Sequence, residues 1–155
     1  MDSLRDWGHA RDYVEMQWLM LQQDAPEDFV IATGKQHSVR DFIRKSAKHL
    51  GITLQFEGEG LDEVGRVDHI DTAIAAQDIA VKPGDVMVAV DATYYRPTEV
   101  DSLLGDPANA KKKLGWETRV TLDEMIAEMI DNDLQIARRN RLLINSGYDV
   151  NQPLE

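Results

Sequence analysis

Residues 29–56 read FVIATGKQHSVRDFIRKSAKHLGITLQF, and the predicted fold class rests on this stretch. Its first five residues form an apolar run rich in β-branched side chains, which indicates a strand buried on both faces. Ser38 is placed to cap a following helix, and Gly51 lies where a left-handed residue ends one. Residues 52–56 then alternate as a second strand does. Strand, helix and strand in this order predict a βαβ unit with parallel strands, so the fold class is α/β.

Three further helices and one further strand are expected around this unit, besides a helix that starts at Thr98. Apolar residues at helical spacing predict helices over residues 9–24 and 121–139, and an Asp-Pro cap predicts a short helix over residues 107–114. The first of these carries apolar residues on so many sides that we expect most of its circumference to be buried. Residues 86–90 are typical of a strand, whereas the glycine-rich residues 57–85 indicate a long surface loop.

Composition indicates a folded, single-domain protein and argues against several classes of partner. The 155 residues suffice for one hydrophobic core, and 43% of them are hydrophobic. A net charge of -11 opposes general binding to nucleic acid and to anionic membranes. The sequence has no cysteine, no apolar run of membrane-spanning length and no start typical of a signal peptide, so we expect a cytoplasmic protein.

A candidate anion site follows the last predicted strand, in the stretch DATYYRPTEVD at residues 91–101. Thr98 is placed to cap a helix with Asp101 in its first turn, which puts Arg96 just outside the helix and Glu99 within it. A guanidinium binds phosphate oxygens in pairs, and a carboxylate accepts hydrogen bonds from ribose hydroxyls. Arg96 and Glu99 suit a phosphorylated ribose. On the residues alone, an Arg-Pro turn leading into an exposed acidic helix is the favoured explanation of the same stretch.

Other candidate sites in the sequence are incomplete. The glycines at positions 58, 60 and 65 follow a strand, but their spacing and the surrounding carboxylates do not fit a dinucleotide-binding loop. His9 and Asp12 lie one helical turn apart without the further ligands that a metal site needs. No tyrosine is followed by a lysine four residues later, and no serine lies in a nucleophile elbow. The residues alone therefore predict binding, without an evident catalytic group.

Four motifs, taken in order, resemble one known family. They are LRDWGHARDYV at residues 4–14, FVIATG at 29–34, YRPTEV at 95–100 and LGW at 114–116. Together they resemble the C-terminal part of the GDP-mannose 4,6-dehydratases, which belong to the extended short-chain dehydrogenase/reductase superfamily. The likeness continues to about Tyr148. It implies the C-terminal part of a Rossmann-type enzyme, a βαβ unit plus a mainly helical substrate-binding domain.

The resemblance also implies how residues 1–155, taken as a single domain, are divided. Residues 9–56 would form the end of the Rossmann sheet, and residues 1–8 and 57–150 would supply elements of the substrate-binding domain. The family's glycine-rich cofactor loop, catalytic threonine and glutamate, and tyrosine-lysine pair have no counterpart in these residues. We therefore expect this chain to be inactive in isolation, because hydride chemistry needs a positioned cofactor.

By the same resemblance, the complete enzymes are NADP-dependent lyases of nucleotide-sugar metabolism. They convert GDP-mannose to GDP-4-dehydro-6-deoxy-D-mannose and water. Arg5 and Arg96 resemble the residues that clamp the GDP pyrophosphate, and Glu99 resembles the acceptor for the ribose hydroxyls. The expected ligands of this chain are GDP-mannose or GDP, and no cofactor is expected for the chain alone.

A second interpretation gives the chain a different kind of function. A small α/β module that has kept the fold without catalysis would associate with itself, because a βαβ sheet without its neighbours exposes apolar edges and faces. A homo-oligomer is therefore expected. Stabilisation of the folded chain by GDP would favour the nucleotide-binding interpretation over the interaction module.

Overall fold

The structure is a computed structural model that describes residues 1–75, 79–95, 100 and 102–150. Helices and strands are mixed along the chain, in agreement with the α/β class. In chain order they are β1 (Leu4–Arg5), α1 (Ala10–Leu21), β2 (His37–Ser38), α2 (Val39–His49), β3 (Ile52–Glu57), η1 (Gly60–Asp62), β4 (Val64–Ile70), β5 (Val86–Ala89), α3 (Ala108–Leu114) and α4 (Leu122–Asn145).

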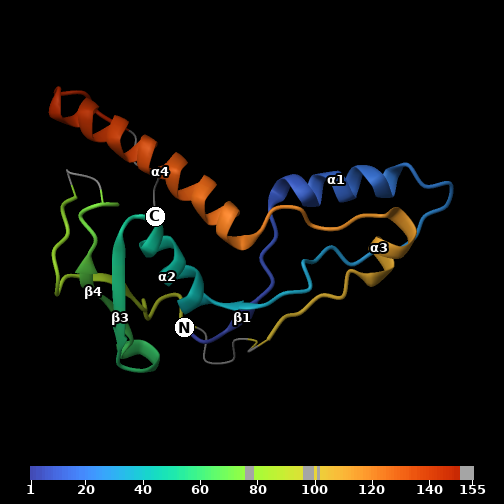
Figure 1. Ribbon diagram of the computed structural model, residues 1–155, viewed down its shortest axis with the longest axis horizontal. Coiled ribbons are helices and arrows are strands. Elements are labelled where there is room, and N and C mark those ends of the chain that lie inside the picture. The colour runs from blue at the N-terminus through green and yellow to red at the C-terminus, as the bar shows by residue number, and fades with distance from the viewer. Residues whose placement is uncertain (76–78, 96–99, 101, 151–155) are drawn as a thin grey trace.

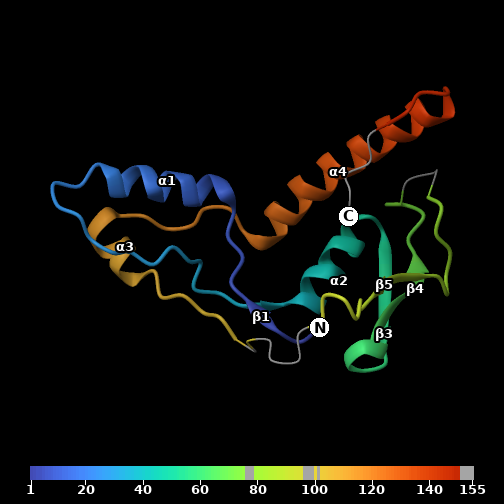
Figure 2. The ribbon, with the colours of Figure 1, turned by 180° about the vertical axis from the view of Figure 1, so that it is seen from behind.

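These elements form an elongated molecule with two ends (Figure 1). At one end the sheet of β3, β4 and β5 lies with α2 and the start of α4, and at the other end α1 lies beside α3. The short ribbon of β1 and β2 lies between the two ends (Figure 2). The C-terminal half of α4 extends away from the rest of the molecule.

The three-stranded sheet has the order β3-β4-β5 and is antiparallel throughout. Leu54 of β3 pairs with Val67 of β4, so β3 does not pair in parallel with residues 29–33 and the predicted βαβ unit is wrong. A strand close by in sequence closes a ladder at a smaller entropic cost than a distant one. The expectation of a loop over residues 57–85 is also wrong, because β4 lies within it. Gly65 and charged residues obscure its alternation, and pairing on both sides together with burial of Val67 makes it a strand.

Residues 29–33 are extended but belong to no strand of the described chain. The prediction of a strand buried on both faces is wrong for this segment, since Val30 is 50% exposed. A strand needs a neighbour that pairs with its backbone, and none of the strands in the described ranges pairs with this segment. Phe29 and Ile31 pack instead into the core under α1.

The start and the packing of α2 follow the prediction. Ser38 Oγ accepts a hydrogen bond from the N–H of Asp41 (3.0 Å), and Gly51 adopts a left-handed φ of 77° after the helix ends. The apolar side of the helix lies against the sheet, and the buried side chains between them are Ala47, Ile52, Leu54 and Val67. This core stabilises the end of the molecule that contains the sheet.

By contrast, α1 buries one side and exposes another. Met16 is completely buried in a core with α3 and Trp116. On the opposite side Val14, Trp18 and Leu21 are 60%, 59% and 82% exposed, so the expectation that most of the helix circumference is buried is wrong. The reason is that α3 and residues 29–31 pack against one side of the helix. We name the three exposed residues the α1 stripe.

α4 begins at the predicted capping box and continues beyond the predicted end, to Asn145. Thr121 Oγ1 accepts a hydrogen bond from the N–H of Glu124 (3.3 Å), and Glu124 Oε2 accepts one from the N–H of Thr121 (2.8 Å). α4 is the longest helix, yet within the described ranges neither it nor any other helix has the length and apolar character needed to cross a membrane.

Replacing Thr121 by Ala should lower the free energy of unfolding by about 1 kcal/mol, because it removes the acceptor that satisfies a free N–H group of the first turn. Urea unfolding followed by circular dichroism measures the change. Thr93→Ala is the matched control, since Thr93 is exposed and its hydroxyl has no hydrogen-bond partner among the described residues. Equal effects of the two substitutions would contradict a stabilising cap.

Candidate functional site

The candidate site begins at β1, which is held from two sides. Both of its residues pair antiparallel with β2. On the other side Leu4 forms a parallel bridge to Ser102, and its carbonyl oxygen accepts a hydrogen bond from the N–H of Leu103 (3.3 Å). β1 thus holds together two parts of the chain that lie far apart in sequence.

Arg5, the second residue of β1, reaches the segment that follows the predicted Arg96 and Glu99 site. Its Nη1 donates hydrogen bonds to the carbonyl oxygens of Leu4 (2.8 Å) and Val100 (2.7 Å). Val100 directly follows Glu99 in the sequence. The tertiary structure therefore brings the Arg5 guanidinium to the end of the predicted binding stretch, across a sequence separation of 95 residues.

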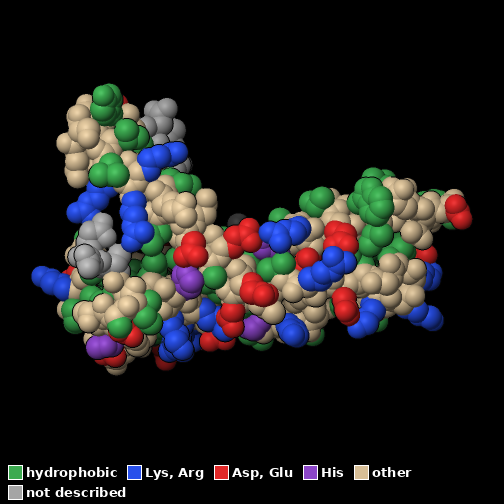
Figure 3. Space-filling view, turned by 45° about the horizontal axis from the view of Figure 1, so that its top comes forward, with side chains coloured by type: hydrophobic (Ala, Val, Ile, Leu, Met, Phe, Trp, Pro, Cys, Tyr) green, Lys and Arg blue, Asp and Glu red, His purple; other side chains and the backbone are tan. Residues whose placement is uncertain are grey.

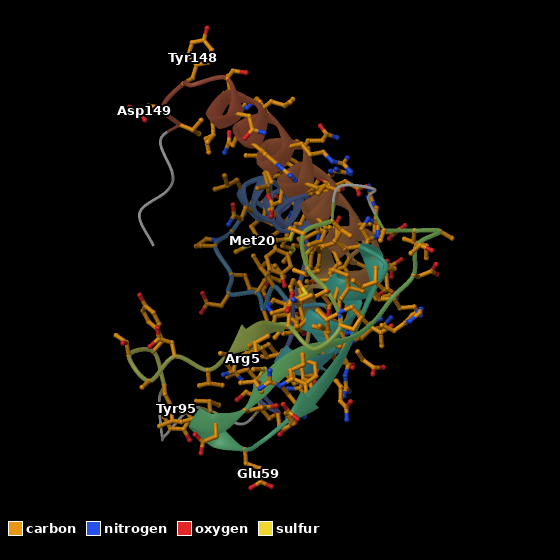
Figure 4. All side chains as sticks on the ribbon, turned by 90° about the vertical axis from the view of Figure 1, so that its left-hand side faces the viewer. Arg5, Met20, Glu59, Tyr95, Tyr148 and Asp149 are labelled. Atoms are coloured by element: carbon orange, nitrogen blue, oxygen red, sulfur yellow. The ribbon has the colours of Figure 1, made fainter. Side chains whose placement is uncertain are left out.

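Arg96 and Glu99 lie outside the described residues, as do Thr98 and Asp101 of the predicted helix cap. Tyr95, directly before Arg96, is described. Its hydroxyl oxygen is 4.0 Å from the position that a Cβ at Gly60 would occupy, so it lies close to η1. Figure 4 shows Tyr95 and Glu59 at one end of the view, with Arg5 nearer the middle.

Asp6 holds the loop beside β1 in place. Its Oδ1 accepts hydrogen bonds from the N–H (2.9 Å) and Oγ1 (2.6 Å) of Thr33, and its Oδ2 accepts one from the N–H of Gly34 (2.9 Å). Gly34 has a φ of +74°, which suits glycine. Asp6 therefore fixes residues 33–34 beside β1. It belongs to the motif at residues 4–14, but no pattern in the sequence indicated this role for it.

Glu63 joins the segment before β1 to the rest of the molecule. Its side chain is 3% exposed and accepts hydrogen bonds from the terminal ammonium of Met1 (2.7 Å) and from Nε of Arg40 (3.0 Å). Arg40 also pairs with Asp2. Burial raises the pKa of Glu63, but the bonds from Met1 and Arg40 outweigh burial and hold the pKa below its ordinary value. No pattern in the sequence marked this residue as a structural acid.

The glycine turn after β3 does not fit a pyrophosphate. It joins two antiparallel strands through η1, whereas a dinucleotide loop leads from a strand into an α-helix. Gly58 has a φ of +80°, and a Cβ there would lie 2.3 Å from the carbonyl oxygen of Asp62. The turn itself therefore requires glycine at this position. Glu57 pairs with Arg66 beside it. The turn therefore does not fit NADP, and we assign it no cofactor.

The two residues weighed for a metal site both have structural roles. His9 caps α1, its Nδ1 accepting a hydrogen bond from the N–H of Arg11 (3.0 Å). Asp12 is 2% exposed and accepts hydrogen bonds from two backbone N–H groups of the loop before α4, those of Arg119 (2.9 Å) and Val120 (3.0 Å). Within the part of the chain that the structure describes, no group of three or more suitable side chains is arranged to hold a metal ion.

A cavity of about 220 Å³ lies between Trp7, the loop at residues 33–37 and the start of α4. Several cationic side chains line it, but two of them have carboxylate partners. Lys45 Nζ lies 2.6 Å from Oδ1 of Asp123, and Arg119 Nη2 lies 2.9 Å from Oε1 of Glu15. Because Lys45 and Arg119 are already compensated by carboxylates, the cavity is a weak candidate site for an anion.

Two solved structures share the fold of this chain. UDP-glucose 4-epimerase from Thermotoga maritima, solved with UDP-glucose, matches 88% of this chain and 33% of its own, with a TM-score of 0.56 and 20% identity. UDP-glucose 4-epimerase from Bifidobacterium longum, solved with NAD+ and UDP, matches 89% of this chain and 31% of its own, with a TM-score of 0.53 and 22% identity. The chain therefore shares its fold with part of these two epimerases.

Sequence similarity then identifies the family. Residues 1–129 match the family described as GDP-mannose 4,6 dehydratase. A GDP-mannose 4,6-dehydratase of Yersinia enterocolitica is 56% identical over all 155 residues, and the human enzyme is 51% identical over 140 residues, or 90% of the chain. The chain belongs to the GDP-mannose 4,6-dehydratase family. It spans 41% of the length of the Yersinia relative and 34% of the human one, and corresponds to their C-terminal part.

Proposed function

We propose that this chain is the substrate-binding, C-terminal part of a GDP-mannose 4,6-dehydratase and that it binds the GDP portion of the nucleotide sugar. The observation that carries the proposal is the hydrogen bond from Arg5 to Val100, because it joins the first predicted phosphate ligand to the residue after Glu99. Membership of the family supports the choice of GDP as the nucleotide.

In the proposed complex, Arg5 and Arg96 bind the pyrophosphate and Glu99 binds the ribose. Guanidinium groups suit this role because they stay charged and donate two parallel hydrogen bonds to phosphate oxygens. They also supply local positive charge in a chain whose net charge of -11 would otherwise repel a nucleotide. An ionised carboxylate accepts hydrogen bonds but cannot donate them, so Glu99 suits the ribose hydroxyls, which can donate. Its negative charge also repels the phosphates from the ribose position.

Catalysis in the proposed enzyme depends on polypeptide outside the region that this chain matches. Conversion of GDP-mannose to GDP-4-dehydro-6-deoxy-D-mannose and water needs hydride transfer, which NADP supplies when bound. Among the described residues the glycine turn does not fit that cofactor. We therefore propose that the isolated chain binds GDP without turning over substrate, and that it acts in the cytoplasm.

GDP should raise the melting temperature of the chain, because a ligand bound by the folded state alone stabilises it. Arg96→Ala should weaken GDP binding by about 1.5 to 3 kcal/mol, the contribution of a hydrogen bond to a charged group. Isothermal titration calorimetry measures the change. Arg138→Ala is the control, since Arg138 is an exposed residue of α4. A melting temperature that does not respond to GDP, or unchanged titration of Arg96→Ala, would contradict the proposal.

We also propose that the chain forms a homo-oligomer, and the α1 stripe is the observation that favours this. Val14, Trp18 and Leu21 recur at the spacing of one helix face, and they are exposed together. Figure 3 shows hydrophobic side chains along this helix, among charged ones. A two-fold axis would bury the same stripe on both copies.

Trp18→Glu should shift the chain towards monomer, because it places a charge in the centre of the α1 stripe. Multi-angle light scattering across a concentration series measures the mass. Ile74→Glu is a matched control, since Ile74 and Trp18 are both 59% exposed. A monomeric unchanged protein at high concentration would rule out association through this stripe.

A further inference from the structure

The C-terminal half of α4 projects from the rest of the molecule. Met125 and Ile126 are the buried residues of this helix, and no residue between 131 and 145, all of which the structure describes, is buried. Figures 1 and 2 show this half extending beyond α2 and the sheet. Residues 1–129 match the family, so the projecting half also lies beyond the matched range.

One face of the projecting half is apolar. Met129, Ile136 and Leu143 recur every seven residues, which is close to two helical turns, so they lie in one line along the helix. They are 48%, 41% and 38% exposed. Met125, four residues before Met129, buries the same side of the helix in its first half. We name Met129, Ile136 and Leu143 the α4 stripe, and a contiguous apolar stripe of this kind is typical of a surface that another molecule covers.

Acidic and basic residues are segregated along the same helix. Residues 120–133 contain no basic residue and five acidic ones, which are Asp123, Glu124, Glu128, Asp131 and Asp133. Residues 134–148 contain no acidic residue and three basic ones, which are Arg138, Arg139 and Arg141. The helix dipole favours this order of charges only within the first and last turns, whereas Asp131, Asp133 and Arg138 lie in the middle of the helix. The dipole therefore does not account for the pattern.

Two of these charged positions are open to a partner. Arg138 and Arg139 are exposed, and neither has an ion pair among the described residues. Asp131 Oδ1 lies 2.9 Å from Nε2 of His49, but its side chain is still 63% exposed. Figure 3 shows hydrophobic and basic side chains together on the projecting half. A partner that covers the α4 stripe therefore meets charges of both signs beside it.

Two α4 helices packed antiparallel satisfy the apolar and the charged features together. A two-fold axis at Ile136 places Met129 of one copy opposite Leu143 of the other, because each lies seven residues from the axis. The same axis sets the arginine half of each helix alongside Asp131 and Asp133 of the other copy. A parallel arrangement would instead set arginines against arginines, which is unfavourable.

We propose that a second copy of this chain covers the α4 stripe, with the two helices antiparallel. The helix supplies both members of the complementary charge pattern, which is why the occupant is a second copy. The net charge of -11 opposes association of whole chains. Residues 129–143, however, contain two aspartates and three arginines, so the surface that pairs does not share that excess. This contact is separate from the α1 stripe and from the proposed GDP site.

Cysteine cross-linking tests the arrangement, because the chain has no cysteine of its own. The Trp18→Glu background removes association through the α1 stripe. Ile136→Cys alone should give a cross-linked dimer with a short bis-maleimide, since this residue faces itself across the axis. Met129→Cys alone and Leu143→Cys alone should not, because their two thiols would lie about 21 Å apart along the paired helices. An equal mixture of the last two variants should cross-link.

Three outcomes would overturn the proposal. Absence of a cross-link from Ile136→Cys would exclude pairing at this axis. Equal cross-linking of Ile136→Cys, Met129→Cys and Leu143→Cys, each alone, would indicate a parallel pair or random collision. Sedimentation of the chain on anionic phospholipid vesicles, without any cross-link, would assign the face to a membrane.

Ile136→Glu should raise the dissociation constant of the dimer about 100-fold in the Trp18→Glu background, because it buries two carboxylates against each other. Analytical ultracentrifugation measures the constant, and circular dichroism verifies that the helix content is unchanged. Met87→Glu is the matched control, since Met87 is 39% exposed and lies in β5. A dimer that Ile136→Glu weakens no more than Met87→Glu would contradict the proposal.

Reversal of the arginine charges separates charge pairing from apolar contact alone. The double variant Arg138→Glu/Arg139→Glu should weaken the dimer about tenfold, because it sets carboxylates beside Asp131 and Asp133 of the other copy. An unchanged dissociation constant would contradict the antiparallel order. GDP titration of Ile136→Glu should match that of the unchanged chain. Loss of the dimer with GDP binding retained, or the reverse, therefore shows which of the two proposals fails.

Discussion

Replacing Glu63 by Gln should lower the free energy of unfolding by about 3 kcal/mol, because removal of one member of a buried ion pair leaves the other uncompensated. Glu63 is 3% exposed and bonds to Met1 and Arg40 at once. Arg40 keeps its contact with Asp2, which limits the loss. Urea unfolding at neutral pH measures the effect.

Glu59→Gln is the matched control for this substitution, since Glu59 is an exposed carboxylate close by in sequence. Its effect should stay within about 0.5 kcal/mol. If Glu63→Gln changed stability no more than Glu59→Gln, the ion pairs of Glu63 would not contribute to the fold. Weaker GDP binding by Glu63→Gln would further indicate that the segment before β1 helps to position Arg5.

The same carboxylate predicts a dependence of stability on pH. The pKa of Glu63 in the folded chain lies below its ordinary value of 4.5. Its contribution to stability is therefore complete above pH 4.5 and is lost as the pH falls below that value. The loss of stability on acidification should be smaller for Glu63→Gln than for the unchanged chain. Equal losses for both proteins would show that other carboxylates control the acid response.

Replacing Asp12 by Ala should also cost about 3 kcal/mol, because it leaves two backbone donors without their charged acceptor. The carboxylate bonds to the N–H groups of Arg119 and Val120 and so ties α1 to the loop before α4. Trp116 Nε1 donates to the carbonyl oxygen of Asp12 (3.0 Å), which makes tryptophan fluorescence a suitable probe of the same contact during urea unfolding.

Asp12→Asn should recover part of the loss, since an amide oxygen still accepts one hydrogen bond. Asp24→Ala is the control, because Asp24 is exposed and its side chain has no partner among the described residues. Equal stability of Asp12→Ala and Asp24→Ala would mean that water replaces the carboxylate without loss. The loop before α4 would then not depend on α1 for its position.

Several elements were predictable because their signals are local. Ser38, Gly51 and Thr121 begin or end helices through contacts with residues a few positions away, and the structure confirms all three. The helix stripes that face the sheet and the β3 strand depend on periodicity, which the sequence displays directly. The ordered motifs also identified the family correctly.

Other features depend on residues that are distant in sequence. In the sequence, Asp6, Asp12 and Glu63 cannot be told from exposed acidic residues. Their hydrogen-bond donors lie far away in the chain and reach them only in the folded structure. The roles of Arg96 and Glu99 stay predictions, since both residues lie outside the described ranges. For Arg5, the family resemblance implied a phosphate ligand, which also stays a prediction, and the structure adds the hydrogen bond to Val100.

By itself, the sequence determined the family, the N-terminal caps of α2 and α4, most of the helices and the alternation of β3, because each of these follows from neighbouring residues or from motifs. The tertiary structure alone decided that β3 pairs with β4 in an antiparallel hairpin and that the α1 stripe is exposed. It also decided that residues 29–32 remain without a ladder among the described residues. Strand pairing and burial each depend on a second segment that packs or pairs with the first. An apolar run therefore predicts that a segment will be buried or paired, but it does not specify the segment that buries it or pairs with it.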